Sequence, residues 1–341
     1  MPKAAKILVL RFSAMGDVAM VAPVLKAFNE DHPEVELLVV SRPLFEPFFK
    51  KVPNASFYPF DPKQKHKGFL GLLKLFIELK ALEITAVADL HNNLRSKILT
   101  FLFFLFGIKS ATVDKGRNEK KELTRKLGKT LIPLKLTVQR YADVFAKLGF
   151  PFRLKNQLCS SKPVKDRMEK WIGVSPFAQH LQKVYPLHKM ESVVLALAAL
   201  GHRIFIFGGS QEEKDIAESW ALQHEGVSSV VQKMRLDEEL ELISNLDVML
   251  SMDSSGMHLA SLENIPVVSV WGATHPYAGF MGYGQSIRDA VQIDLNCRPC
   301  SIYGNVPCYR GDFACMNNLS EQTVIDQVLE KLRNDQNIDF N

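Results

Sequence analysis

The sequence predicts an α/β protein made of two doubly wound domains, each a mostly parallel sheet covered by helices. Three observations carry this prediction. Short apolar runs alternate with helical patterns along nearly the whole chain. The alternation stops in a polar stretch that contains two prolines and restarts near residue 170. At 341 residues, the chain is long enough for two domains of about 150 residues each.

The first half opens with a strand and a helix. Lys6–Leu10 (KILVL) is a continuous apolar run, which is typical of a strand buried on both faces of a parallel sheet. A helix is predicted over 17–28, because apolar residues recur at helical spacing from Val18 to Phe28. Asp17 stands at the turn between the strand and the helix, so the two elements form a βα unit.

The same alternation predicts the rest of the first domain. Further strands are predicted at 35–40, 85–89 and 110–113, and helices at 69–82, 93–106 and 138–148. Residues 150–165 are the predicted linker, because two prolines and many polar residues gather there. The two domains are therefore predicted to span residues 1–160 and 161–341.

The second half repeats the pattern. Strands are predicted at 171–175, 203–207, 247–251 and 267–271, and one of the helices between them is predicted to open at Ser255. A final helix near 320–332 is expected to reach back across the first domain. Two similar Rossmann-like sheets are thus expected.

The composition excludes several classes of protein. Hydrophobic residues make up 47% of the chain and charged residues 23%, which excludes a disordered or collagen-like chain. The net charge of +5 is spread along the sequence, so a dedicated nucleic-acid binder is not expected. The expected partner is an anion, either the phosphates of a nucleotide or an acidic lipid surface.

The chain is expected to be cytoplasmic, because its N-terminus shows neither the long apolar core nor the small-residue cleavage site of a signal peptide. The most apolar stretch, Ile98–Ile108 (ILTFLFFLFGI), is too short to cross a bilayer, which needs about 20 apolar residues. It is predicted to be a buried helix, with a membrane-touching face as the alternative.

Residues with catalytic chemistry follow the predicted strands, at the sheet edge where doubly wound domains bind ligands. In the loop 11–18 (RFSAMGDV), Asp17 is a candidate general base that takes a proton from an acceptor hydroxyl. The alternative is that Asp17 only caps its helix.

The segment 251–258 (SMDSSGMH) is a candidate anion site, because it follows a strand and opens a helix. Free backbone N–H groups and the helix dipole at Ser254, Ser255 and Gly256 would suit a diphosphate. The alternative is a plain Asp/Ser helix cap with His258 as a packing residue.

Two basic sites complete this set. Lys183 lies in the long connection 175–186 and is a candidate for neutralising a departing phosphate, with a solvated lysine as the alternative. In the first domain, Arg95 and Lys97 of the segment NNLRSK are candidates for holding acidic groups of an acceptor.

Four late cysteines are spaced C-x2-C-x7-C-x6-C in a segment rich in proline and glycine: Cys297, Cys300, Cys308 and Cys315. They are candidates for a structural zinc site. Disulfides are not expected in a cytosolic chain, so the alternative is four unmodified cysteines.

The combination of RFSAMGDVAMVAPVLKAF near the start with MDSSGMHLASLENIPVVSVWGATHP near the end resembles glycosyltransferase family 9, the lipopolysaccharide heptosyltransferases. DLHNNLRSK and the cysteine segment ending in CMNNLS are also similar to that family, so the resemblance spans nearly the whole chain. It implies a GT-B fold with two Rossmann-like domains facing a central cleft. It also implies a metal-independent, inverting transfer from ADP-heptose to an acceptor built on lipid A and Kdo, at the cytoplasmic face of the inner membrane.

The resemblance also implies roles for individual residues. Asp17 becomes the expected base and Lys183 the expected phosphate-side lysine. The expected donor-binding residues are Ser175, Asp253, Ser254, Ser255, Gly256 and His258. The expected acceptor-binding residues are Ser13, Gly16, Asn93, Arg95 and Lys97. One departure concerns the donor, since His275 in the loop ATHP stands where the family commonly has an acidic residue.

Three other functions fit an α/β chain of this kind. A Rossmann oxidoreductase is disfavoured, because no G-x-G-x-x-G follows the first strand. A catalytically silent relative that serves as a binding or scaffold protein would not need Asp17 and Lys183. A phosphorylase-like enzyme would accept inorganic phosphate in place of a glycolipid.

Overall fold

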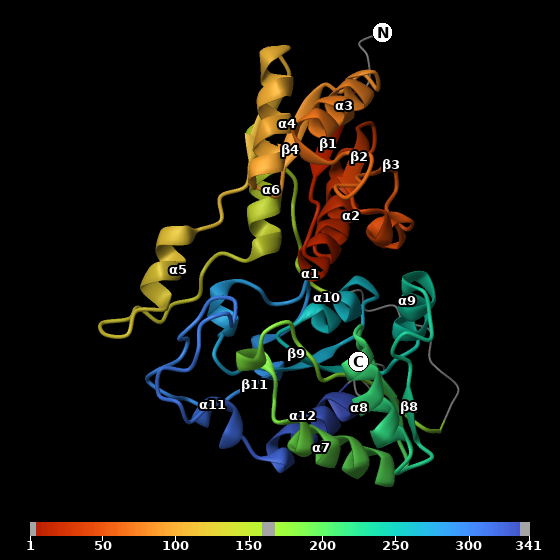
Figure 1. The fold of residues 1–341 in the computed structure, drawn as a ribbon, viewed down its shortest axis with the longest axis vertical. Helices are drawn as coiled ribbons and strands as arrows, with labels where there is room; N and C mark the ends of the chain where they lie inside the picture. The colour runs from red at the N-terminus through yellow and green to blue at the C-terminus, as the bar shows by residue number, and fades with distance from the viewer. Residues whose placement is uncertain (1–4, 159–167, 335–341) are drawn as a thin grey trace. The chain divides into compact units, whose positions relative to one another are not determined.

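The chain forms two compact units in the computed structural model, which describes residues 5–158 and 168–334 (Figure 1). Residues 1–116 and 135–156 make the first unit, and residues 117–134 and 157–341 make the second. Segment 117–134 therefore groups with the second unit, although it precedes the last helix of the first. The predicted domain boundary at residue 160 lies outside the described residues and stays a prediction.

The first unit contains a five-stranded parallel sheet in the order β3-β2-β1-β4-β5. Its strands are β1 (Lys6–Leu10), β2 (Glu36–Ser41), β3 (Ala55–Pro59), β4 (Ala86–Asp89) and β5 (Lys109–Thr112). Leu10, at the end of the central strand, pairs with Val40 on one side and Asp89 on the other. Strands β1 and β4 therefore end level with each other, and β2 runs one residue further.

Helices cover both faces of this sheet (Figure 1). On one face, α2 (Val21–Asp31) packs against α6 (Thr137–Leu148), and the rings of Phe28 and Phe145 are 4.8 Å apart. On the other face, α3 (Gly68–Lys80) and α4 (Leu94–Leu105) share one apolar core with the strands. This two-sided cover confirms the doubly wound prediction.

The first unit differs from the prediction in two places. The expected helix over 17–28 is two helices, α1 (Met15–Ala19) and α2, with Met20 between them. Strand β3 was not predicted, because its sequence ASFYP ends in proline and its residues are only partly buried. It lies at an edge of the sheet, where a continuous apolar run is not required.

The second unit contains a six-stranded parallel sheet in the order β11-β10-β9-β6-β7-β8. Its strands are β6 (Trp171–Ser175), β7 (Arg203–Ile206), β8 (Val227–Ser229), β9 (Val248–Met252), β10 (Val267–Val270) and β11 (Ala290–Val291). The four strands predicted from the sequence are present, and the short edge strands β8 and β11 are additional. This sheet is again doubly wound.

One face of the second sheet is covered by α7 (Leu187–Ala199), α8 (Gln211–Ala221) and α12 (Glu321–Asn334), which share one core with it. The other face carries α9 (Leu236–Ser244) and α10 (Ser255–Leu262). The last helix places Val324 and Val328 in the core of this sheet. Its expected contact with the first domain stays a prediction.

The apolar stretch 98–108 is not the buried helix that was predicted. In α4, Leu99 and Phe103 are buried against the sheet, whereas Phe101 and Phe104 are about 60% exposed. The helix covers the sheet with one side only, and no other element covers its outer side in the described residues. No helix in residues 5–158 or 168–334 is long and apolar enough to span a bilayer.

Candidate active site

Each sheet has one point at which the strand order reverses. In the first sheet the reversal lies between β1 and β4, and in the second between β6 and β9. Ligands of doubly wound sheets bind beyond the carboxyl ends of the strands at this point. The sequence-predicted site residues follow these same strands, so each unit has one candidate cluster.

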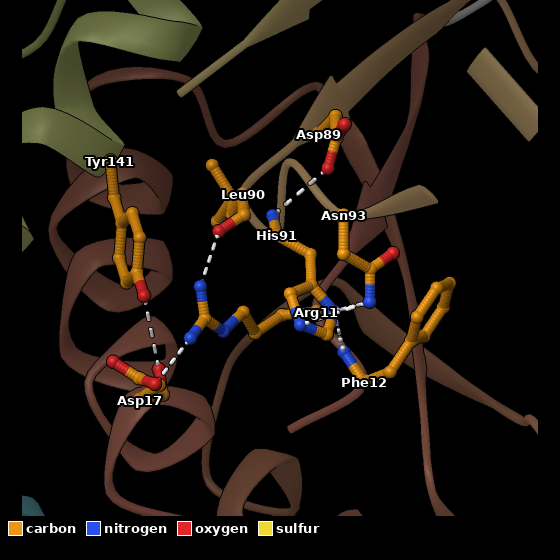
Figure 2. A network of polar contacts seen from close by, with 8 residues as sticks. All are labelled: Arg11, Phe12, Asp17, Asp89, Leu90, His91, Asn93 and Tyr141. Carbon is orange, nitrogen blue, oxygen red and sulfur yellow. Dashed lines mark hydrogen bonds and ion pairs between the residues drawn. The ribbon is translucent and has the colours of Figure 1, made fainter. Parts of the chain in front are cut away.

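Arg11 is the centre of the first cluster (Figure 2). It follows β1, its side chain is only 8% exposed, and it forms an ion pair with the Asp17 carboxylate. The same guanidinium donates a hydrogen bond to the Leu90 carbonyl at 2.8 Å. Burial opposes the charge of Arg11, but Tyr141 and Asp17 outweigh it and raise its pKa. A permanent cation therefore links the ends of β1 and β4.

Asp17 is not a helix cap. The N-cap of α1 is Ala14, and Asp17 lies one turn further along with its side chain 30% exposed. The buried Tyr141 hydroxyl donates a hydrogen bond to the Asp17 backbone carbonyl at 3.4 Å (Figure 2). This is a second contact that fixes the position of Asp17, besides its ion pair with Arg11. A partly exposed carboxylate fixed by an arginine is able to accept a proton from a bound hydroxyl.

Asp89 and His91 support this arrangement from the end of β4. The Asp89 carboxylate accepts hydrogen bonds from the His91 and Asn92 backbone N–H groups at 2.9 and 2.8 Å. Burial, together with the charge of Arg11, lowers the pKa of His91 to about 3. The ring is therefore neutral, and its Nδ1 accepts the Phe12 N–H at 3.2 Å (Figure 2). These bonds tie the loop after β1 to the loop after β4.

The predicted acceptor residues divide into three groups. Asn93 is the N-cap of α4, where its side chain accepts the Ser96 N–H at 2.9 Å. Ser13 lies in the connection between β1 and α1, and Gly16 is buried in α1 beside Asp17. Arg95 and Lys97 are exposed on the first turn of α4. The two cations are available to an anionic acceptor, whereas Asn93 already has a structural role.

Lys183 and Asp253 form the centre of the second cluster. The Lys183 ammonium lies 2.9 Å from the Asp253 carboxylate, and the two side chains are only 16% and 6% exposed. Lys183 is therefore not a solvated lysine, and Asp253 is not a helix cap. The pair joins the connection after β6 to the end of β9, directly at the reversal of the strand order.

The N-terminus of α10 lies beside this ion pair. Ser254 is the N-cap, but its side chain makes no capping hydrogen bond to the helix. The first N–H groups of a helix have no partner within the helix, so they are suited to an anion. A Cβ on Gly256 would collide with the Ser175 side chain, which explains why glycine stands here. His258 is buried one turn further along.

His275 has a capping role in the structure. It is the N-cap of a short 3-10 helix, Pro276–Ala278, and its Nδ1 accepts the Tyr277 N–H at 3.1 Å. Burial, with the nearby charge of Arg298, lowers the pKa of His275 to about 4. At this N-cap the neutral imidazole accepts a backbone N–H, as an aspartate carboxylate also does.

The late cysteine segment was the candidate for a structural zinc site. Cys297, Cys300, Cys308 and Cys315 are free thiols that line one small cavity. No group of three or more metal-ligating side chains is arranged for an ion in the described parts of the chain. The predicted zinc site is therefore not supported.

Arg298, between the first two cysteines, is a buried residue beside the candidate site that the sequence reasoning missed. Its buried guanidinium donates to the backbone carbonyls of Trp271, Gly272 and Thr274. Arg11 was missed in the same way. In both cases the available signal was a cation in an otherwise apolar context, since buried arginines are nearly always partnered.

A family model gives the first comparison with known proteins. The model of glycosyltransferase family 9 (heptosyltransferase) matches residues 72–306, which is more than half of the chain. The chain is also 24% identical over 299 residues to the lipopolysaccharide core heptosyltransferase OpsX of Haemophilus influenzae, covering 79% of each sequence. Two solved structures extend the comparison to the fold.

The Escherichia coli ADP-heptose lipopolysaccharide heptosyltransferase II has a TM-score of 0.69 at 17% identity, covering 97% of this chain and 99% of that one. The Escherichia coli heptosyltransferase WaaC with ADP has a TM-score of 0.68 at 18% identity, covering 96% and 99%. Together with the two doubly wound sheets, these similarities identify the fold as GT-B. The chain therefore belongs to glycosyltransferase family 9 and is a glycosyltransferase.

Proposed function

We propose that this glycosyltransferase moves a heptose from ADP-heptose onto the inner core of lipopolysaccharide, with inversion at the sugar carbon. The observation that carries the proposal is that each sheet has one suitable group where its strand order reverses. In the second sheet, a helix N-terminus suited to an anion lies beside the buried Lys183. In the first sheet, the carboxylate of Asp17 is held by Arg11. The names of the similar proteins support the choice of sugar and acceptor, since they include ADP-heptose and lipopolysaccharide.

On the donor side, we propose that the diphosphate binds the N–H groups of Ser254, Ser255 and Gly256. Lys183 lies on the neighbouring connection and offsets the negative charge that grows on the nucleotide as the glycosidic bond breaks. Asp253 positions the lysine, because the ion pair fixes the ammonium within 2.9 Å of the carboxylate. Ser175 and His258 complete this donor site.

On the acceptor side, we propose that Asp17 takes the proton from the attacking hydroxyl. The hydroxyl oxygen forms the new bond to the anomeric carbon, and the bond to the diphosphate breaks in the same displacement, so ADP leaves with its electron pair. One displacement inverts the configuration. Ser13, Gly16 and Asn93 shape the acceptor site, while Arg95 and Lys97 bind acidic groups of the acceptor. The reaction transfers no electrons, and we propose that it needs no cofactor.

The proposal is tested by nucleotide release from a panel of ADP-, UDP- and GDP-sugars with a deacylated lipopolysaccharide acceptor. We expect ADP release that requires both ADP-heptose and the acceptor. Asp17→Asn should reduce kcat at least about 100-fold, because general-base catalysis is typically worth about 10²–10⁴-fold. A matched control is Asp143→Asn, which removes a surface carboxylate that pairs with Lys135.

Either of two results would overturn the proposal. Turnover of a UDP- or GDP-sugar in place of the ADP-sugar would show that the donor is wrong. Full activity of Asp17→Asn would show that another group removes the proton.

A further inference from the structure

An apolar surface that no other element in residues 5–158 and 168–334 covers lies on the outer side of α3 and α4. Seven large side chains make up this α3–α4 face, all of them more than half exposed: Leu70, Ile77, Leu94, Phe101, Phe104, Leu105 and Phe106. The two helices pack side by side on the same face of the first sheet (Figure 1). A cluster of large exposed hydrophobic residues of this kind marks an interaction site.

The face follows from the helical spacing. On α3, Leu70, Lys74 and Ile77 are four and three residues apart and so share one side of the helix. On α4, Leu94, Lys97, Phe101 and Phe104 follow the same rule. The opposite sides of both helices, such as Leu75 and Leu99, are fully buried against the sheet. Each of the two helices therefore has two apolar sides, one packed in the core and one exposed.

The charges on these helices are almost all positive. The basic residues on α3 and α4 are Lys74, Lys80, Arg95 and Lys97, all exposed. The single acidic residue is Glu78, which is already occupied by Lys65 at 3.0 Å and by the Tyr58 hydroxyl at 2.6 Å. An exposed apolar surface surrounded by cations has the chemistry of a lipid-facing helix.

Lys80 shows how cations and aromatic rings combine on this face. Its ammonium lies 3.4 Å from the centre of the Phe106 ring. The lysine side chain can therefore lie along apolar surface while its charge reaches a polar headgroup. Lys80 ends α3 and Phe106 directly follows α4, so this contact joins the exposed sides of the two helices into one surface.

We propose that the α3–α4 face binds the surface of an anionic phospholipid bilayer. The aromatic and aliphatic side chains enter the boundary between headgroups and acyl chains, and the four cations contact the lipid phosphates. A second copy of this chain is a poorer occupant, because it would bring the same cations together. The inference rests on the proposed function in one respect, namely that the acceptor is a membrane lipid.

The position of α4 links this face to the acceptor site. Lys97 lies on the exposed side of α4 that forms this face, and it is also one of the predicted acceptor residues. Leu94 lies one turn before it. Both follow directly from the end of β4, where Asp89 and His91 support the catalytic carboxylate. A bilayer bound to the face would therefore present its lipid at the acceptor end of the first unit.

The experiment is co-sedimentation of the purified full chain with vesicles. One set contains phosphatidylglycerol and phosphatidylethanolamine, and the other only phosphatidylcholine. We expect the parent to bind the anionic vesicles at low salt and to dissociate at high salt. The double variant Phe101→Asp/Phe104→Asp should lower the bound fraction about tenfold or more, because it places two charges in the apolar contact.

Two further variants separate this role from misfolding. Leu222→Asp is the matched control, since Leu222 is 89% exposed at the end of α8 in the second unit, and it should bind vesicles like the parent. Lys74→Gln/Lys80→Gln should reduce binding to anionic vesicles without changing the helices. Release of ADP with deacylated, soluble acceptor should stay at the parental level in all three variants.

The proposal is overturned if the parent binds neither kind of vesicle, or if Phe101→Asp/Phe104→Asp binds as well as Leu222→Asp. It is also overturned if the parent is a dimer that this double variant converts to a monomer, because the face would then join two copies. Failure of the proposed function looks different. In that case the parent releases no ADP from ADP-heptose, whatever its vesicle binding.

Discussion

Arg11 connects two loops that are distant in sequence, and this explains how one carboxylate can be fixed without being buried. The residue bonds to Asp17 six positions later and to Leu90 seventy-nine positions later. Lysine has no planar fork and so cannot make both contacts in the same geometry. The role we assign to Arg11 is therefore positioning of the base.

We expect Arg11→Lys to lower kcat about 10–100-fold with little change in KM, since misplacing a catalytic group by about 1 Å can cost about 10²-fold. Arg11→Met should lower kcat further than Arg11→Lys, because lysine keeps the positive charge and methionine does not. Steady-state kinetics over a pH series would measure both effects. Equal loss in the two variants, with an unchanged pH profile, would indicate a purely structural role.

Glu239 on α9 gives a pH-dependent stability. Burial raises its pKa from 4.5 to about 7. Between these values the folded state holds a proton that the unfolded chain has lost, so the free energy of unfolding falls as the pH rises from about 4.5 to about 7. Glu239→Gln should therefore be more stable than the parent at pH 8, by at most about 3 kcal/mol.

Urea denaturation at pH 4.5 and pH 8 checks this expectation. Glu241→Gln, on the exposed side of the same helix, is the control. It should leave the free energy of unfolding unchanged at both pH values. An equal effect of Glu239→Gln at both pH values would contradict the titration.

At the scale of secondary structure, prediction succeeded for the strands inside each sheet and for the edge strand β5, but it missed the edge strands β3, β8 and β11. Strands such as β1 and β9 are continuous apolar runs, so their type and position follow from the sequence. Strand β8 is three residues long and lies at an edge, which leaves little pattern to detect. The outer side of α4 was predicted to be buried because its residues are apolar, but these residues are exposed and are not part of the core.

The same contrast holds for the site. The loops with Asp17 and Ser254 were predictable, because they end strands and open helices. The Lys183–Asp253 pair was not, since its partners are seventy residues apart and only the adjacency of β6 and β9 brings them together.

The close approach of α10 to β6 leads to an element-scale prediction. Gly256→Ala should displace the start of α10 from Ser175 and weaken ADP binding about tenfold or more, which corresponds to about 1.4 kcal/mol. Gly209→Ala is the matched control, because no atom lies within 4 Å of the added Cβ. Isothermal titration calorimetry with ADP measures both, and unchanged affinity in Gly256→Ala would place the diphosphate elsewhere.

For the whole molecule, the two sheets have separate hydrophobic cores and each candidate cluster lies within one unit. Chains organised in this way often unfold in more than one step. The proposed donor cluster belongs entirely to the second unit, so we expect a nucleotide to stabilise that unit directly.

We expect ADP at 100 times its Kd to stabilise the second unit by about 2.7 kcal/mol and to leave the first nearly unchanged. Hydrogen exchange resolved along the chain would show slower exchange in α10 and β9, with the core of β1 unaffected. Equal slowing in both units would contradict the assignment of the donor site to the second unit alone.

The grouping of residues 117–134 with the second unit has a consequence for protein engineering. The Lys129 ammonium donates to the carbonyls of Cys297 and Pro299 at 2.9 and 3.0 Å, so this segment is matched to the cysteine loop although helix α6 follows it. A hybrid enzyme joined once, near residue 156, would combine this segment with a foreign cysteine loop. Exchanging donor domains between family members therefore requires three junctions, two of them enclosing residues 117–134.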